Sequence, residues 1–177
     1  DGWSDAAFAQ ARRVVAPGPL RVGADEVSYA LHIVLRVRLE HALLTGTLAV
    51  ADLPDAWAAQ SQSLFGFAPD NDAQGCLQDI HWYRGLLGYF PSYALGQMLA
   101  AQIAAAAEMD IPELWDGEGR FDLLADWLRA RIHRWGSFHG SEALTVAATG
   151  EALSAKPLLC HLARRYGVAA RSTTTSV

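Results

Sequence analysis

The sequence has few of the features that mark disulfide scaffolds, membrane spans and nucleic-acid binders. Its two cysteines, Cys76 and Cys160, are too few in 177 residues for a disulfide framework and are not spaced as a metal or redox pair. The longest apolar stretch, residues 93–107, is Ala-rich and interrupted by Gly96 and Gln97, so we predict no membrane span. A net charge of −5 argues against nucleic acid or an anionic membrane as the main partner.

Lysine is also scarce, because thirteen of the fourteen basic residues are Arg and only Lys156 is Lys. Arg grips carboxylates in a bidentate fork that Lys cannot form, so a single Arg among apolar residues is a candidate anion-binding group. The N-terminus lacks the basic start and apolar middle of a signal peptide, and it lacks an initiator Met. We therefore expect a cytoplasmic chain that begins inside a longer protein.

The motifs of metal and nucleotide sites are missing. The six histidines include no i, i+4 pair and no His-Glu-x-x-His, and the sequence has no Cys-x-x-Cys, phosphate-binding loop or Gly-x-Ser-x-Gly turn. Spacing alone therefore predicts no metal bound by this chain. We expect the isolated His32 and His41 to have structural roles, as a lone His on an amphipathic helix more often packs or is solvated.

What the sequence does contain is helical periodicity. Hydrophobic residues make up 51% of the chain, and they recur about every 3.6 residues, without the sustained two-residue alternation of β-strands. The pattern predicts an all-α helical bundle, with a single domain over residues 1–170 and a frayed tail over 171–177. The longest predicted helix, residues 25–45, carries an apolar stripe expected to be buried: Val27, Ala30, Leu31, Val34, Leu35, Leu39, Ala42 and Leu43.

Helix start and stop residues delimit the other predicted helices. Asp52 is the expected N-cap of a helix over 53–65, and Ser141 and Ser154 are the expected N-caps of two later helices. Glycines follow several predicted ends. The remaining expected helices are a short piece ending near residue 80 and those over 91–109, 121–135, 141–149 and 154–166.

Two local groups of residues have chemical potential. In the first, Arg21 lies among apolar residues just before Asp25 and Glu26. Arg21 could bind a carboxylate ligand while Asp25 or Glu26 orients it. Alternatively, the two carboxylates only cap the next helix and Arg21 forms a surface ion pair.

The second group is aromatic and surrounds Pro91. His81 precedes Tyr89 and Tyr93, which are four residues apart on either side of the proline. Two phenols and an imidazole could donate hydrogen bonds to a developing oxyanion or a substrate carboxylate. The alternative is an aromatic cluster that only fills the bundle.

Together these two segments resemble the carboxypeptidase Taq family of metallocarboxypeptidases, which are helical enzymes related in fold to neurolysin-type zinc peptidases. The family signature Ile/Tyr-Arg-x-x-Ala-Asp-Glu/Gln matches residues 20–26 except that Leu20 replaces the usual Ile or Tyr, and Gly-Tyr-Phe-Pro-x-Tyr-x-Leu-Gly matches residues 88–96. Gln-Asp-Ile-His-Trp at residues 78–82 is also familial, and the resemblance spans roughly residues 5–167. The family's zinc-binding and catalytic motifs are absent, so the resemblance implies the C-terminal part of such an enzyme.

For the intact enzyme, the resemblance implies hydrolysis of single residues from free peptide C-termini by a zinc ion, or another divalent metal, bound by upstream residues outside this chain. It assigns substrate binding to Arg21, with Asp25 and Glu26 capping the helix or holding Arg21, and oxyanion contacts to His81 and either Tyr89 or Tyr93. The chain alone is expected to be inactive, with a second copy or the missing N-terminal half as its partner. The alternative is an inactive helical peptide-binding module derived from the family.

Overall fold

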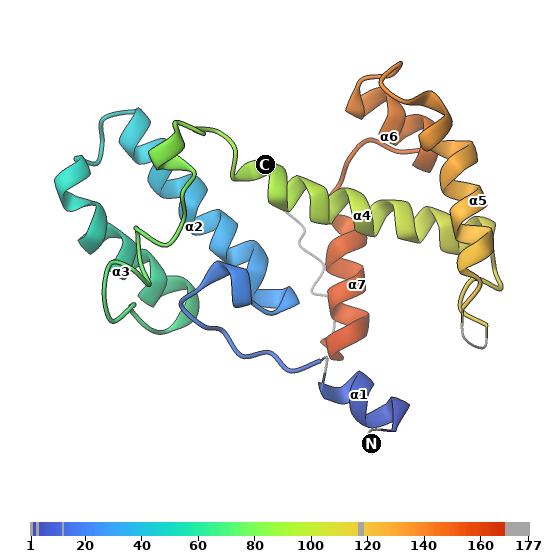
Figure 1. Cartoon of the computed structure of the whole chain (residues 1–177), viewed down its shortest axis with the longest axis horizontal. Coiled ribbons are helices and arrows are strands. Elements are labelled where there is room, and N and C mark those ends of the chain that lie inside the picture. The colour runs from blue at the N-terminus through green and yellow to red at the C-terminus, as the bar shows by residue number, and fades with distance from the viewer. Residues whose placement is uncertain (1, 3, 12, 117–118, 169–177) are drawn as a thin grey trace, which may run out of the picture. The chain divides into compact units, whose positions relative to one another are not determined.

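The computed structural model describes residues 2, 4–11, 13–116 and 119–168, and every regular element in them is helical (Figure 1). The predicted all-α class is therefore confirmed. The chain divides into two compact units, Asp1–Ala94 and Leu95–Val177, which are described separately. The single domain predicted over 1–170 stays a prediction, and the predicted tail over 171–177 lies outside the described residues.

Unit 1 is built on two long helices, α2 (Glu26–Leu44) and α3 (Leu53–Phe65). Figure 1 shows the two helices side by side. The hydrophobic core of the unit contains Leu35, Leu39, Trp57 and Cys76. A short helix that the sequence did not predict, α1 (Asp5–Ala11), precedes them. Three single turns of 3₁₀-helix complete the unit: η1 (Arg21–Gly23), η2 (Val50–Asp52) and η3 (Trp82–Arg84).

The caps of α2 and α3 differ. Asp25 occupies the N-cap of α2, and its carboxylate accepts hydrogen bonds from the backbone N–H groups of Val27 and Ser28. Asp52 occupies the N-cap of α3, as predicted, but its side chain makes no cap hydrogen bond. At the other end, α3 stops at Gly66, whose φ of 84° is left-handed and suits glycine.

The buried face of α2 is not the apolar stripe that the periodicity predicted. Leu35 and Leu39 are buried as expected, but Val34 is exposed. The most deeply buried residues of the helix include four polar side chains at four-residue spacing: Ser28, His32, Arg36 and Glu40. Polar groups are buried at acceptable cost when they have partners, and those of Arg36 and Glu40 lie in the segment around residues 79–88.

Residues 73–80 form successive turns, not the short helix that was predicted. The carbonyl of Gln74 accepts a hydrogen bond from the Gln78 side chain, with 2.7 Å between Nε2 and O. The same Nε2 lies 3.1 Å from the Pro19 carbonyl oxygen. Side-chain bonds of this kind compete with the backbone ladder of a helix, and here they fasten the turns to the segment before η1.

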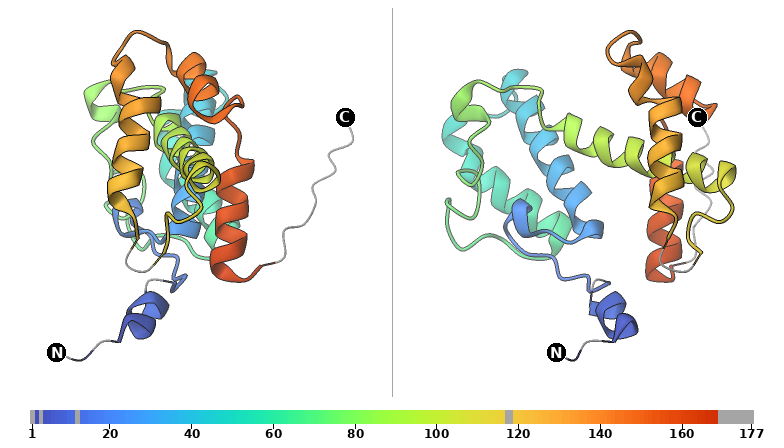
Figure 2. Two further views of the ribbon diagram at one scale, coloured as in Figure 1. Left: turned by 90° about the vertical axis from the view of Figure 1, so that its right-hand side faces the viewer. Right: turned by 45° about the vertical axis from the view of Figure 1, so that its right-hand side comes forward.

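Unit 2 holds most of α4 (Pro91–Asp110), whose first residues belong to unit 1, and three further helices (Figure 2). These are α5 (Phe121–Arg131), α6 (Ser141–Thr149) and α7 (Lys156–Tyr166). Its core contains Ala107, Ile111, Leu114 and Trp127. None of the helices in the described part of the chain combines the length and hydropathy of a membrane span.

Two predictions for unit 2 need correction. The helix predicted over 121–135 is interrupted at Ile132, which leaves helical geometry with φ of −124° and is followed by the 3₁₀ turn η4 (His133–Trp135). Ser141 is the first residue of α6, and Gly140, without a capping side chain, is its N-cap. The N-cap of α7 is likewise Ala155 and not Ser154, although Ser154 Oγ accepts the Lys156 N–H at 3.2 Å.

Candidate functional site

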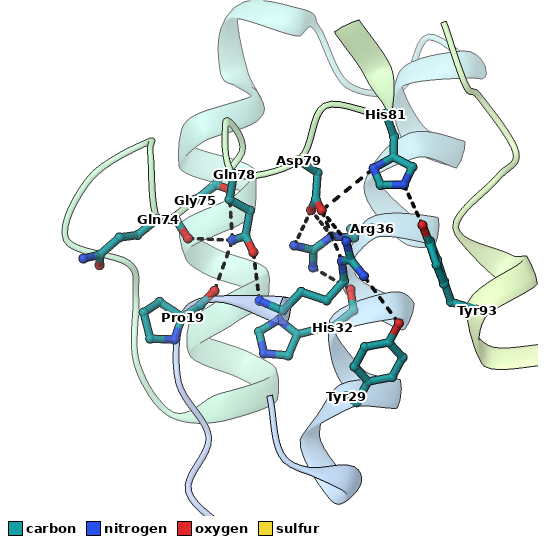
Figure 3. Close-up of polar contacts among 11 residues, drawn as sticks. Pro19, Tyr29, His32, Arg36, Gln74, Gly75, Gln78, Asp79, His81 and Tyr93 are labelled. Carbon is teal, nitrogen blue, oxygen red and sulfur yellow. Dashed lines mark hydrogen bonds and ion pairs between the residues drawn. The ribbon is translucent and has the colours of Figure 1, made fainter. Parts of the chain in front are cut away.

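The centre of the candidate site is Asp79, a carboxylate shared by two arginines (Figure 3). Arg21 donates to Oδ1 through Nε and Nη2, at 3.1 and 2.8 Å. Arg36 donates to Oδ2 through Nε at 2.6 Å. The three side chains are 11% or less exposed, so this cluster lies in the interior of unit 1.

Backbone contacts hold both arginines in place. The N–H of Arg21, at the start of η1, donates to Gln78 Oε1 at 2.9 Å, which brings η1 next to Asp79. Arg36 lies in the middle of α2 and donates through Nη1 to the carbonyl of His32, one turn earlier, at 2.8 Å. Its guanidinium also lies over the Trp57 ring, 4.9 Å from the centroid.

The charges of this cluster do not balance. Burial would raise the pKa of Asp79, but the charge of Arg36 and the hydrogen bonds of both arginines outweigh it and lower that pKa. Burial also lowers the pKa of Arg36, in part offset by Asp79, whereas hydrogen bonding to Asp79 raises the pKa of Arg21 despite its burial. Two guanidinium groups on one carboxylate leave these three side chains together with one net positive charge.

His32 lies beside this positive cluster and stays neutral. Burial, and then the charge of Arg36, lower its pKa to about 4. Its ring packs on Phe65 with centroids 4.4 Å apart, and its Nε2 is buried without a hydrogen-bond partner among the described residues. The ring therefore adds no charge to the site at neutral pH.

The predicted aromatic group is assembled next to the cluster. His81 Nε2 and the Tyr93 hydroxyl are 2.9 Å apart, within hydrogen-bond distance. The Arg21 guanidinium lies over the Tyr93 ring, 4.9 Å from its centroid, which links this group to the arginine pair. Tyr89 packs edge-on against Tyr93 with ring centroids 5.4 Å apart. His81, Tyr89, Tyr93 and Arg21 therefore belong to one site.

The two tyrosines differ in what their hydroxyl groups can do. The Tyr93 hydroxyl is engaged by His81. The Tyr89 side chain is 46% exposed, and its hydroxyl makes no hydrogen bond within the described part of the chain. Tyr89 can therefore offer its hydroxyl to a ligand without losing an internal bond.

Glu40 of α2 supports the segment that carries these rings. Its Oε2 accepts a hydrogen bond from Trp82 Nε1 at 2.6 Å, and its Oε1 accepts one from the Gly88 backbone N–H. Trp82 in turn packs edge-on against Trp57 and Phe90. The buried carboxylate therefore joins Trp82 and Gly88, the two ends of a loop over residues 82–88 that includes η3, to α2.

Asp25 acts at the start of α2 and makes no hydrogen bond with Arg21 in the described part of the chain. The Asp25 carboxylate caps α2 and also accepts the Ala16 N–H at 3.0 Å. The hydrogen bonds around it outweigh its burial and lower its pKa. The carboxylate that orients Arg21 in the structure is Asp79 and not Asp25, whereas the role of Glu26 stays a prediction.

Sequence reasoning missed Asp79, Arg36 and Glu40 as members of the site. One signal was present, because Asp79 lies two residues before His81 in a segment already noted. The other signal was the four-residue spacing of polar residues along α2, which places Arg36 and Glu40 on one face of the helix.

The described residues include no group of three or more His, Cys, Asp or Glu side chains that could hold a metal ion. The side chains assembled in unit 1 are instead donors, namely guanidinium, phenol and imidazole groups, which suit an anion or a carbonyl oxygen. These residues therefore do not fit a metal, and the chemistry available to them is ligand binding and hydrogen-bond donation.

Comparison with known proteins gives consistent matches. The sequence model of the family described as carboxypeptidase Taq (M32) metallopeptidase matches residues 1–166. Thermostable carboxypeptidase 1 of Thermus thermophilus is 45% identical over 161 residues, which are 90% of this chain and 32% of that protein. Carboxypeptidase 1 of Bacillus subtilis is 39% identical over 162 residues, again 90% and 32%.

Solved structures agree with the sequence matches. Trypanosoma cruzi metallocarboxypeptidase 1 superposes with a TM-score of 0.88 at 34% identity, covering 93% of this chain and 35% of that one. The M32 carboxypeptidase from Deinococcus radiodurans R1 gives 0.87 at 38% identity, with coverages of 93% and 35%. The chain thus spans about a third of the length of the relatives that it matches.

Proposed function

Because this chain belongs to the carboxypeptidase Taq (M32) metallopeptidase family, we propose that it supplies the substrate-contacting part of an enzyme that removes single residues from free peptide C-termini. The observation that carries the proposal is the net positive charge of Arg21, Arg36 and Asp79. A substrate α-carboxylate would neutralise this charge. In this proposal Arg21 binds the substrate carboxylate, because its Nη1 has only a long hydrogen bond, 3.4 Å, to the Tyr29 hydroxyl.

The tyrosines and His81 have a second role in the proposal. Cleavage of a peptide bond places negative charge on the scissile carbonyl oxygen, which needs hydrogen-bond donors. The exposed Tyr89 hydroxyl is the first candidate donor, and Tyr93, held by His81, is the second. In this proposal His81 fixes the orientation of Tyr93, and Asp25 acts only as the cap of α2.

The metal of the intact enzyme, zinc or another divalent ion, is proposed to be bound by residues outside this chain, where it would activate water for attack on the peptide bond. The chain alone is proposed to be inactive. Stoichiometric zinc in the purified chain, with release of C-terminal amino acids from a peptide, would overturn both statements. The homodimer and the cytoplasmic location stay predictions from the family resemblance.

Calorimetric titration with trialanine and its C-terminal amide tests the carboxylate site. We expect the chain to bind the free acid more tightly, and Arg21→Ala to remove that preference. The control is Arg120→Ala, since Arg120 also grips an aspartate through Nε and Nη2 but lies in unit 2. Equal affinity of the unmodified chain for acid and amide would contradict the proposal. Preference for the acid without hydrolysis, even after the rest of the protein is supplied, would favour the binding-module alternative.

A further inference from the structure

The 82–88 loop, which includes η3, lies between His81, which orients Tyr93, and Tyr89, the first candidate donor. Trp82 opens the loop directly after His81, and Gly88 closes it directly before Tyr89. The residues between them are exposed, so the loop itself makes little core. What fixes the ends of this loop therefore also fixes the backbone next to His81 and Tyr89.

The first half of the loop is closed by its own backbone. The Leu86 N–H donates to the His81 carbonyl at 2.9 Å, and the Gly85 N–H donates to the Trp82 carbonyl at 3.0 Å. The second half depends on a distant residue, since the Gly88 N–H donates to Glu40 of α2, 48 residues earlier. Gly88 has a φ of 75°, a left-handed backbone conformation that glycine adopts without steric cost.

Glu40 is well suited to hold both ends. Glu40 is only 5% exposed. Its Oε2 accepts a hydrogen bond from Trp82 Nε1, and its Oε1 accepts one from the Gly88 N–H. Bonds to a charged acceptor are stronger than neutral ones, and burial strengthens them further. The Trp82 ring is itself fixed edge-on between Trp57 and Phe90, so the indole N–H has a defined direction.

We propose that Glu40 is a positioning residue of the substrate site: its carboxylate clamps Trp82 and Gly88 and thereby sets where His81 and the Tyr89 hydroxyl stand. The inference rests on the proposed function, because it assigns Glu40 a role in the same site. Glu40 touches neither substrate nor reacting atoms. It acts through the backbone on either side of the loop.

The direct test is Glu40→Gln in the 177-residue chain. The amide keeps the size of the side chain but offers one acceptor oxygen in place of two. One of the two donors, the Trp82 indole N–H or the Gly88 N–H, then faces an NH₂ group and loses its hydrogen bond. Amide hydrogen exchange, followed by NMR, should show Gly88 exchanging roughly ten times faster. The matched control is Glu108→Gln in unit 2, since Glu108 also accepts an indole N–H, from Trp115 at 2.8 Å.

Titration with trialanine and its amide gives the functional readout. Glu40→Gln should weaken binding of the free acid about tenfold, because small misplacements of a binding group are costly. Glu108→Gln should leave it unchanged. Trp82→Phe, which removes only the indole donor and keeps Gly88 bonded, should give a smaller loss and serves if Glu40→Gln does not fold.

The outcomes separate the two proposals. If the unmodified chain does not prefer the acid, the proposed function fails. If it does, but Glu40→Gln changes neither Gly88 exchange nor affinity, or Glu108→Gln weakens affinity equally, the positioning role of Glu40 is overturned.

Discussion

Asp79 and His32 show, at the scale of single residues, how unit 1 accommodates buried charge. Asp79 is shared by Arg21 and Arg36, and His32 next to them is kept uncharged. Breaking a buried pair costs more than the pair itself contributes, since it leaves a charge without a partner. The site therefore depends on a carboxylate that is 58 residues from one of its partners in sequence.

His32 makes stability depend on pH in a defined window. Its pKa is about 4 in the fold against an ordinary 6.5. Between these values the unfolded chain takes up a proton that the folded chain does not. The free energy of unfolding therefore falls as pH drops from about 6.5 to about 4, by about 3 kcal/mol from this group. In His32→Phe, urea unfolding at a series of pH values should show that the free energy of unfolding falls less between pH 6.5 and pH 4 than it does in the unmodified chain.

The control for this prediction lies on the same helix. His41→Gln replaces an exposed histidine of α2 and is unfolded in urea at the same series of pH values for comparison. A profile for His32→Phe that parallels that of the unmodified chain between pH 6.5 and 4 would contradict the assignment.

The site residues that sequence reasoning found are those with local signatures. Arg21 has its run of apolar neighbours, and Tyr89 and Tyr93 flank a proline. Asp79 and Glu40 have no such local context, because their roles come from partners 42 to 58 residues away that only folding brings near. The four-residue spacing along α2 marks the helix face that carries Glu40, but it does not identify the distant partner.

At the scale of elements, α2 and α3 provide a matched pair of helix starts. Asp25 accepts two backbone N–H groups at the start of α2, whereas Asp52 makes no cap bond at the start of α3. Asp25→Ala should therefore lower the free energy of unfolding by about 1–2 kcal/mol. Asp52→Ala should change it by less than about 0.5 kcal/mol. Equal losses in urea unfolding for the two variants would refute the difference between the caps.

Helix positions were predictable where residue type alone sets a limit. The range of α3 and the ends of α6 and α7 agree with the sequence, because Gly66, Gly150 and Gly167 take left-handed φ values that other residues rarely adopt. Residues 73–80 were not predictable in this way. Their turns depend on the Gln78 side chain bonding to Pro19, 59 residues away.

At the scale of the whole molecule, the chain exposes many large apolar side chains. Unit 1 alone exposes Val22, Val50, Leu77, Ile80 and Tyr83 by more than half. Exposed apolar side chains favour association where they adjoin one another. We expect light scattering to report a mass of at least twice 19.1 kDa at micromolar concentration. A mass of 19.1 kDa across the concentration range would count against it.

The all-α class was predictable at this scale because helical periodicity runs through nearly every segment. The division into two compact units was not predictable, because the boundary after residue 94 falls inside the continuous helix α4. Gly96, close to this boundary, does not break the helix. Composition reports whether a core can form, but not how many.

The four-residue spacing of Ser28, His32, Arg36 and Glu40 also limits how the gene can change. Successive members lie about one helical turn apart, so their register depends on the number of residues between them. One inserted or deleted residue within α2 would turn every later side chain by about 100°, taking Glu40 away from Trp82 and Gly88 in a single step. We expect α2 to tolerate many substitutions on its exposed side, but no change in length.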